Sequence, residues 1–452
     1  MISSIFEQFV EATPITVMVR GIMERIFKPQ ALDELFETHA VKQYTRELLF
    51  SNLVSLMSLV VSGIHPSVSA AYKALEKDMG VSRPALYGKL NGMELSISQA
   101  LVRYSASNLK AIIEELEVDK VQLLPGYDLR IADGNHLGGT EHRLKVLRNN
   151  LARALPGQSI AVLDPQKMLV TDIFLNQDGH AQERSMLPLI LATVQERQVW
   201  IADRNFCTRQ FLFGIAQRSS YFIIREHKSL PYSEISSLKE IGETETGRVF
   251  EQKIQVTDQS GMSLRLRRVV IELFKPTRQG DKQVAILTHL PSSVADAKTI
   301  TRLYLQRWNI EGMFQVITDT FNCELNTLGY PKAALFVFCV AIVAFNILST
   351  VKAALKSVHG VGKVEAGLSD YYLVEEIQGT FRGMTIALPA SFWLPIAQMN
   401  LTEFAQTLKQ WATSVNLKRF CSSPRQKKKR TARAEVSSAY RTEQEAKTKT
   451  YL

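Results

Sequence analysis

Three acidic residues stand where their carboxylates could act together. Asp133 and Asp203 each end a short apolar run, in the segments LRIADGN and VWIADRN, and Glu311 lies in a segment with helical spacing. Gly134, directly after Asp133, is expected to permit a sharp exit from the strand. Side chains at strand ends point into the mouth of an α/β core, where sites usually form. Carboxylates that converge there offer hard oxygen ligands suited to Mg²⁺. Two such ions, ~3.5–4 Å apart, would support an in-line displacement at phosphorus.

Residue type alone leaves this assignment open, because 44 Asp and Glu residues allow many accidental triples. His180 and Glu183 have a spacing that could suit a metal-binding pair on a helix. Since no partner ligands accompany them, they are interpreted as the start of a helix that could at most support the site from outside. Trp200 and Trp308 could stack on an unpaired base, but both are interpreted as core residues.

The elements that must position these residues are predicted to be short strands. Five apolar or β-branched runs, each ending in polar or turn residues, predict strands at 127–135, 159–166, 168–175, 199–205 and 221–226. The segment 185–197, between the third and fourth runs, has helical spacing. Paired antiparallel strands followed by a helix and a further strand predict an α/β or α+β catalytic core.

Residues from about 14 to 116 have apolar side chains at helical spacing and few Gly or Pro, which predicts a helical N-terminal region. Within 72–92, one helix ends near Gly80, Ser82 suits an N-cap, and a second short helix stops at Asn91. This outline fits a DNA-binding helix-turn-helix and an ordinary helical hairpin equally well.

A second strand-rich stretch at 247–290 alternates polar and apolar residues, which indicates a half-exposed antiparallel sheet. Helical spacing returns at Ala295. The most apolar run, Ala333–Phe345, has 13 residues. A membrane span needs ~20, so this run is predicted to be a buried helix.

The formal net charge of +10 favours a polyanionic partner such as DNA. Residues 418–452 hold 11 Lys and Arg against 3 Asp and Glu, and such a basic arm is typically solvated and disordered. The four cysteines lack the paired spacing of a structural zinc site and fit a reducing compartment. The N-terminus has no secretion signal, so a cytoplasmic location is expected.

Three segments resemble, in order, the motifs of bacterial insertion-sequence transposases of the "insertion sequence four" family. In YLQRWNIEGMF, Tyr304, Arg307 and Glu311 have the spacing of that family's Tyr-Arg-Glu-Lys signature. They lie about one turn apart, so all three are expected to share one helix face. IADGN and VWIADRNF are similar to its first and second Asp motifs. The long interval from Asp203 to Glu311 resembles the β-rich subdomain that the family inserts before its Glu helix. The resemblance covers roughly residues 125–350.

The resemblance implies a catalytic, metal-binding triad of Asp133, Asp203 and Glu311, with two Mg²⁺ ions for which Mn²⁺ may substitute. It also implies DNA contacts by Tyr304, Arg307 and Arg204. Where the family has its Lys, this chain has Thr318, which offers a neutral hydrogen bond in place of a cation. We therefore expect weaker or altered DNA binding, with the metal-binding acids intact.

The expected fold is α/β (α+β), with a ribonuclease-H-like catalytic core, an inserted β-rich subdomain and a helical N-terminal domain. The expected parts are a helical domain at 1–120, the first part of the core at 121–226, the insertion at 227–294, the Glu helix and C-terminal helices at 295–417, and a basic tail at 418–452. The expected function is Mg²⁺-dependent cleavage and strand transfer at the terminal repeats of an insertion element, by a homodimer on double-stranded DNA and without a membrane. A stand-alone metal nuclease and a DNA-binding, weakly active or inactive relative remain as alternatives.

Overall fold

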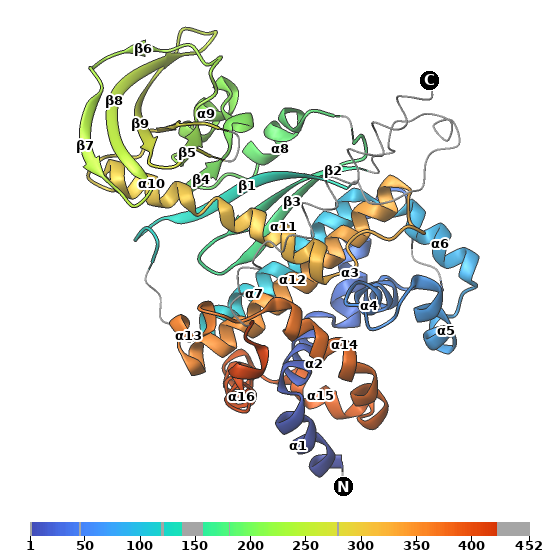
Figure 1. Cartoon of the computed structure of the whole chain (residues 1–452). Helices are drawn as coiled ribbons and strands as arrows, with labels where there is room; N and C mark the ends of the chain where they lie inside the picture. Colours follow the sequence, from blue (N-terminus) through green and yellow to red (C-terminus); the bar gives the residue numbers. More distant parts are fainter. Residues whose placement is uncertain are drawn as a thin grey trace, which may run out of the picture.

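The computed structural model describes residues 2–44, 47–118, 122–137, 157–179, 181–277 and 280–422. Its first five strands are β1 (Asp128–His136), β2 (Gln158–Asp164), β3 (Leu169–Asn176), β4 (Gln198–Ala202) and β5 (Tyr221–Arg225). They lie side by side in the order β3-β2-β1-β4-β5 (Figure 1). The first three strands pair antiparallel, whereas β1, β4 and β5 are parallel.

This mixed order is that of a ribonuclease-H-like core, and the expected fold class is confirmed. All five strands predicted from the apolar runs are present, within one to three residues of the predicted ends. The helix predicted between β3 and β4 is shorter than expected. It consists of the 3₁₀ turn η2 (Glu183–Met186) and the single α-helical turn α8 (Leu187–Leu191). His180 lies outside the described residues.

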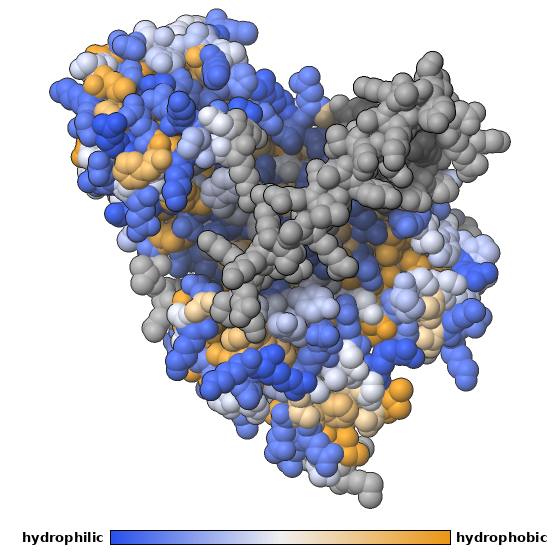
Figure 2. All heavy atoms as spheres, viewed as in Figure 1, coloured by the Kyte–Doolittle hydropathy of each residue, from blue (hydrophilic) through white to orange (hydrophobic). Residues whose placement is uncertain are grey.

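The inserted strands extend the same sheet. They are β6 (Ser233–Glu234), β7 (Lys239–Glu243), β8 (Gly247–Thr257), β9 (Ser263–Leu273) and β10 (Gln283–Thr288). β10 pairs antiparallel with β5 and with β9, so the described strands form one ten-stranded sheet. Polar residues dominate the visible surface of these inserted strands, as Figure 2 shows. The half-exposed antiparallel sheet predicted for this stretch is therefore observed.

Each face of the central strands packs against a different set of helices. Ile131, Val199 and Ile201 belong to one core, which they share with the N- and C-terminal helices. Ala132 and Trp200, the alternate residues of the same strands, belong to a second core formed with α8 and α9 (Arg209–Ala216). Strand alternation thus divides the sheet between two hydrophobic layers.

The N-terminal helices are α1 (Ile2–Ala12), α2 (Pro14–Ile26), α3 (Pro29–His39), α4 (Phe50–Val61), α5 (Val68–Met79), α6 (Arg83–Gly92) and α7 (Leu95–Glu115). The predicted helix pair is present as α5 and α6. α5 ends at Gly80, whose φ of 65° is the left-handed conformation that glycine adopts without strain, and Ser82 is the N-cap residue of α6. DNA binding by this pair stays a prediction.

The C-terminal helices are α10 (Ala297–Leu305), α11 (Trp308–Thr320), α12 (Pro331–His359), α13 (Val361–Glu365), α14 (Asp370–Ala387), α15 (Ala390–Gln398) and α16 (Leu401–Thr413). α12 is the one helix in the described ranges long and apolar enough to cross a membrane, and its most apolar window is completely buried in the protein. The predicted buried helix is therefore confirmed, although it is much longer than the apolar run.

Asn346, in the middle of α12, joins this helix to the edge of the sheet. Its side-chain amide donates to the carbonyl oxygen of Val170 at 2.9 Å, and its side-chain oxygen accepts from the Val170 amide at 2.8 Å. These bonds satisfy backbone groups of the edge strand β3. The amide interrupts an apolar stretch of sequence because it completes the sheet.

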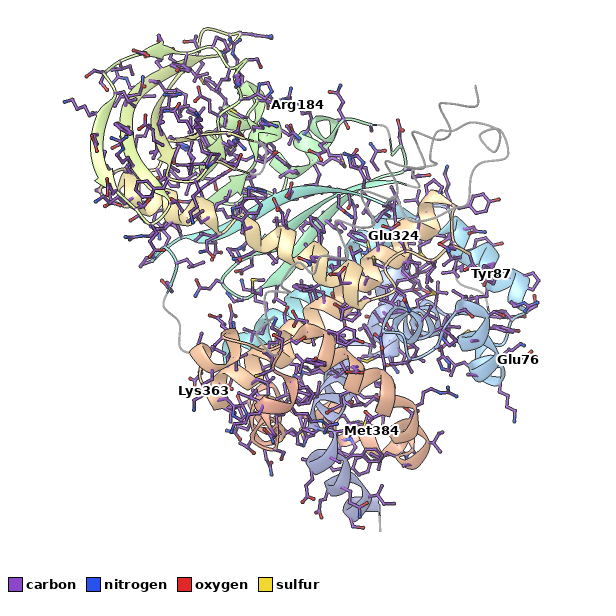
Figure 3. The ribbon with its side chains drawn as sticks, in the orientation of Figure 1. Glu76, Tyr87, Arg184, Glu324, Lys363 and Met384 are labelled. Atoms are coloured by element: carbon purple, nitrogen blue, oxygen red, sulfur yellow. The ribbon has the colours of Figure 1, made fainter. Side chains whose placement is uncertain are left out.

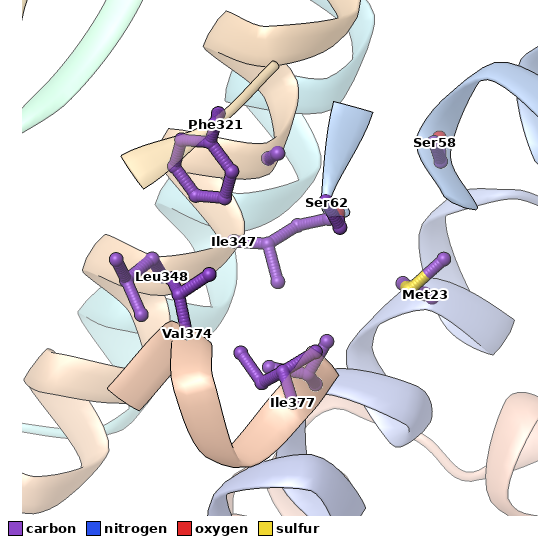
Figure 4. A pocket seen from close by; sticks show the side chains of 10 residues that line it. Met23, Ser58, Ser62, Phe321, Ile347, Leu348, Val374 and Ile377 are labelled. Carbon is purple, nitrogen blue, oxygen red and sulfur yellow. The ribbon is translucent and has the colours of Figure 1, made fainter. Parts of the chain in front are cut away.

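The helices enclose a small apolar cavity of about 20 Å³, which has room for about one water molecule (Figure 4). Met23, Ile347 and Ile377 line it from three helices. Beyond α16, the chain forms the 3₁₀ turn η4 (Leu417–Phe420), where Phe420 is buried. The basic tail was predicted to begin at 418, but residues 418–422 are folded, and the rest of that prediction lies outside the described residues.

Candidate functional site

Asp133 and Asp203 lie next to each other on adjacent parallel strands. The parallel pairing of β1 with β4 ends at Ala132 and Ala202, and the two aspartates are the next residues of their chains. Asp133 is not at the end of its strand, as the sequence had suggested, because β1 continues to His136 by pairing with β2. Asp133 is instead the first residue beyond the part of β1 that pairs with β4, where these two strands diverge.

Gly134 was predicted to permit a sharp exit from the strand, and this interpretation is wrong. The residue stays in β1, paired with Ile160. A Cβ atom at this position would lie 2.0 Å from Oε1 of Glu183. A larger side chain at residue 134 would therefore displace the carboxylate of Glu183 from its place beside the strand.

The third acid comes from the junction of α10 and α11. Nη1 of Arg307 donates to Oε1 of Glu311 at 2.7 Å and lies 3.6 Å from Oδ2 of Asp133. The guanidinium also lies 5.9 Å from the ring centre of Tyr304. These residues were predicted to share one helix face. The helix is in fact interrupted at Gln306 and Arg307, but the backbone stays close enough to helical to keep the i,i+4 contact.

All six residues predicted for the site line one cavity of about 950 Å³. They are Asp133, Asp203, Arg204, Tyr304, Arg307 and Glu311. Inserted strands form part of the cavity wall, with Ile271, Leu273 and Val284. The insertion thus contributes to the same cavity that the acids line.

Burial dominates the electrostatics of the site. It raises the pKa of Asp133 to about 7. The positive charge of Arg307 opposes this effect, whereas the negative charges of Asp203 and Glu183 add to it. Burial likewise raises the pKa of the Tyr304 hydroxyl, whose side chain is 8% exposed. An additional cation beside Asp133 would relieve the cost of its charge.

Asp203 and Arg204 form a short turn after β4. The Asp203 carboxylate accepts from the backbone amide of Asn205 at 2.8 Å and so caps the 3₁₀ turn η3 (Arg204–Phe206). Arg204 is exposed and forms no ion pair with another residue of the described ranges. Its guanidinium is thus available to an anion in the cavity.

The two tryptophans differ in their surroundings. Trp200 is 2% exposed and lies in the core, as predicted. Trp308 is 56% exposed at the cavity, so its interpretation as a core residue is wrong. Its ring lies 4.6 Å from the Arg307 guanidinium. The helical spacing suggested burial, but the break before α11 turns this side chain outward.

Thr318 lies two turns beyond Glu311, on the exposed side of α11. Its hydroxyl donates to the Phe314 carbonyl oxygen at 2.9 Å, within the same helix. It is not among the residues that line the cavity. A lysine side chain at this place would extend into solvent beside the cavity. The threonine hydroxyl instead donates its hydrogen bond within α11.

The donor set suits divalent ions, but it is not closed around one. In the part of the chain that the structure describes, no three His, Cys, Asp or Glu side chains converge as a metal site. Glu311 is engaged by Arg307, which also reaches Asp133. The guanidinium of Arg307 thus supplies the positive charge between two of the predicted ligands that a metal ion would otherwise supply. The residues fit the ion by type and position, provided that Glu311 leaves Arg307.

Glu183 was interpreted as the start of a helix that could at most support the site from outside; it is the first residue of η2, and its charge acts on Asp133. Oε2 of Glu183 accepts from the side-chain amide of Asn205 at 3.3 Å, and the carboxylate lies over Gly134. The signal available in the sequence was the glycine directly after Asp133, which the interpretation as a turn had already explained.

Residues 130–346 match the family model of the transposase DDE domain. No curated protein matches the chain. Among solved structures, a piggyBac transposase synaptic complex with hairpin DNA matches with a TM-score of 0.43 and 11% identity, over 88% of this chain and 84% of that one. The family match begins in β1, includes Asp133, Asp203 and Glu311, and ends in α12. The stretch from β1 to α12 is therefore similar to a transposase DDE domain.

Proposed function

We propose that this protein is a transposase of the "insertion sequence four" family that cuts DNA at the ends of its own element and joins them to a target. The carrying observation is that Asp133, Asp203 and Glu311, which are distant in sequence, line one cavity within the matched domain. Arginine side chains lie beside the acids in that cavity, and DNA offers the phosphates that such cations bind.

Asp133, Asp203 and Glu311 would hold two Mg²⁺ ions, with Mn²⁺ as a substitute. When bound, such ions activate the attacking oxygen and stabilise the leaving oxygen at phosphorus. Asp133 would hold both ions, because its side chain is 20% exposed against 43% for Glu311, and it stands beside Asp203 where the parallel pairing of β1 and β4 ends. Glu311, whose side chain is 43% exposed, has the freedom to turn from Arg307 toward an ion.

The cationic residues would bind the DNA backbone. Arg204 has no ion pair among the described residues and can contact a phosphate directly. When Glu311 no longer pairs with it, Arg307 would turn its fork-shaped guanidinium to the phosphate at the cut, a geometry that suits two parallel hydrogen bonds. Tyr304 is mostly buried against Arg307, so it would act by holding that side chain in the cavity.

Two element ends must be cut together for transposition, and we propose a homodimer on double-stranded DNA for this purpose. We also propose that it acts in the cytoplasm. Sedimentation of the full-length protein with and without end DNA tests the dimer. A complex with one protein chain for two bound ends would contradict it.

The function is tested by excision and joining on the DNA that flanks the gene, with Mg²⁺. Wild type is compared with Glu311→Gln, which removes one metal-binding charge and nearly keeps the shape, and with Glu196→Gln, an exposed control outside the cavity. Cutting and joining at defined ends by wild type and the control, but not by Glu311→Gln, supports the proposal.

The other outcomes separate the alternatives. Cutting without joining, and without preference for those ends, would identify a stand-alone nuclease. Binding to the ends without cutting, in Mg²⁺ and in Mn²⁺, would identify a DNA-binding relative, and Thr318→Lys would then be the rescue to attempt.

A further inference from the structure

Glu183 places a negative charge at a site that already holds three carboxylates, and it has no cation of its own. Its side chain is half-buried, and it forms no ion pair with a Lys, Arg or His of the described residues. Its hydrogen-bond donor is the neutral side-chain amide of Asn205. A half-buried carboxylate beside other carboxylates is costly unless a cation compensates it.

The chain holds this carboxylate in place from two sides. Oε1 lies where the side chain of residue 134 would begin, since a Cβ atom there would be 2.0 Å away. Oε2 accepts from Nδ2 of Asn205 at 3.3 Å. The backbone amide of the same asparagine donates to Asp203. Glu183 is thus linked through one residue to the second aspartate and touches the neighbour of the first.

The backbone around Glu183 is fixed as well. Nε of Arg184, which Figure 3 labels, donates to the carbonyl oxygen of Asn205 at 3.0 Å and joins η2 to η3. Glu183 is the first residue of η2, and Asn205 lies in η3 directly after Asp203. The two turns therefore present their side chains at the point where β1 and β4 diverge.

We propose that Glu183 is a fourth carboxylate of the metal site and supplies charge to the divalent ion held by Asp133 and Asp203. This inference rests on the proposed function, because it needs that ion. It assigns Gly134 a matching role, since the absent side chain makes the room that the Glu183 carboxylate occupies. A purely structural Glu183 would instead affect folding and leave ion binding unchanged.

The test is a Mn²⁺ titration of the full-length protein without DNA, followed by the electron paramagnetic resonance signal of the free ion. The variants are Glu183→Gln, Asp203→Asn and the control Glu196→Gln, with thermal unfolding in EDTA measured for each. We expect Glu183→Gln to weaken Mn²⁺ binding about tenfold or more while its melting temperature in EDTA stays near that of wild type. The control should bind as wild type does.

Gly134→Ala provides a second test that leaves the charge of Glu183 intact. The added methyl group must displace the carboxylate, so this variant should also bind Mn²⁺ more weakly. In a Glu183→Ala background the space is empty, and the same change should then have little further effect. Equal weakening in both backgrounds would mean that the methyl group acts on the strand or on Asp133, and the proposed pairing of Gly134 with Glu183 would be refuted.

The remaining outcomes separate this inference from the function on which it rests. If Asp203→Asn weakens Mn²⁺ binding but Glu183→Gln does not, the fourth carboxylate is refuted and the metal-dependent function stands. If wild type binds no Mn²⁺, or Asp203→Asn binds it unchanged, both proposals fail. If Glu183→Gln lowers the melting temperature in EDTA but leaves Mn²⁺ binding unchanged, its role is structural and the inference is wrong.

Discussion

Replacing Asp133 with Asn should make the metal-free protein more stable, and the gain should grow with pH. The pKa of Asp133 is raised from 3.8 to about 7, chiefly by burial. Between these values the folded protein keeps a proton that the unfolded chain has lost. Wild-type stability therefore falls as the pH rises from about 4 to about 7, and it stays level above that.

The magnitude follows from the two pKa values. With about 1.36 kcal/mol per pKa unit, the cost of the Asp133 charge is about 1.7 kcal/mol at pH 5 and about 4.3 kcal/mol at pH 8. Asn cannot ionise and keeps a side-chain oxygen that can accept from the Gly134 amide, as Asp133 does. The stability difference between Asp133→Asn and wild type should thus increase by about 2.5 kcal/mol from pH 5 to pH 8.

Urea unfolding in EDTA at both pH values measures this difference. The control is Asp319→Asn, at an exposed position of α11. A difference for Asp133→Asn that stays constant, or shrinks toward pH 8, would refute the argument that burial controls this carboxyl. Adding Mg²⁺ at pH 8 should stabilise wild type and not the variant.

Three further predictions concern the cavity and the packing around it. Glu311→Gln should lower the cleavage rate at least about a hundredfold with the melting temperature preserved, since a metal ligand supplies several kcal/mol in the transition state. Single-turnover cleavage measures this rate, and a near-normal rate would contradict the prediction. Trp308→Ala should weaken binding to DNA with an unpaired base by about 1–3 kcal/mol and leave fully paired DNA nearly unaffected, because the exposed ring offers a stacking surface; fluorescence anisotropy with both DNAs decides this. Asn346→Ala should cost roughly 3 kcal/mol in the free energy of unfolding, since both Val170 backbone groups lose their partner, and urea unfolding would show a cost below 1 kcal/mol if water replaced the amide.

Much of the site could be predicted because its residues belong to local patterns. The strands before Asp133 and Asp203 were visible as apolar runs, and their parallel pairing brings the two carboxylates together. The i,i+4 contact of Arg307 with Glu311 follows from helical geometry and survives the break between α10 and α11. Local spacing, together with the resemblance to the transposase motifs, was therefore sufficient to select these residues.

Other features depended on contacts between distant segments. Helical spacing placed Trp308 on a core-facing stripe, but the interruption at Gln306 and Arg307 exposes it. Gly134 suggested a turn, because nothing near it in the sequence shows that a carboxylate from residue 183 lies where its side chain would be. No periodicity in the sequence encodes the helix break before Trp308 or the approach of Glu183 to Gly134.

The sequence by itself determined the strands, the long buried helix and the three acids with their neighbouring arginines, because these depend on hydrophobic periodicity and short spacing. The tertiary structure alone decided that the inserted strands line the same cavity as the acids, that Arg307 bridges two of the acids, and that Glu183 lies beside the site. Those outcomes depend on how the sheet, the insertion and the helices pack on one another. The burial that raises the pKa of Asp133 to about 7 arises only when these parts come together.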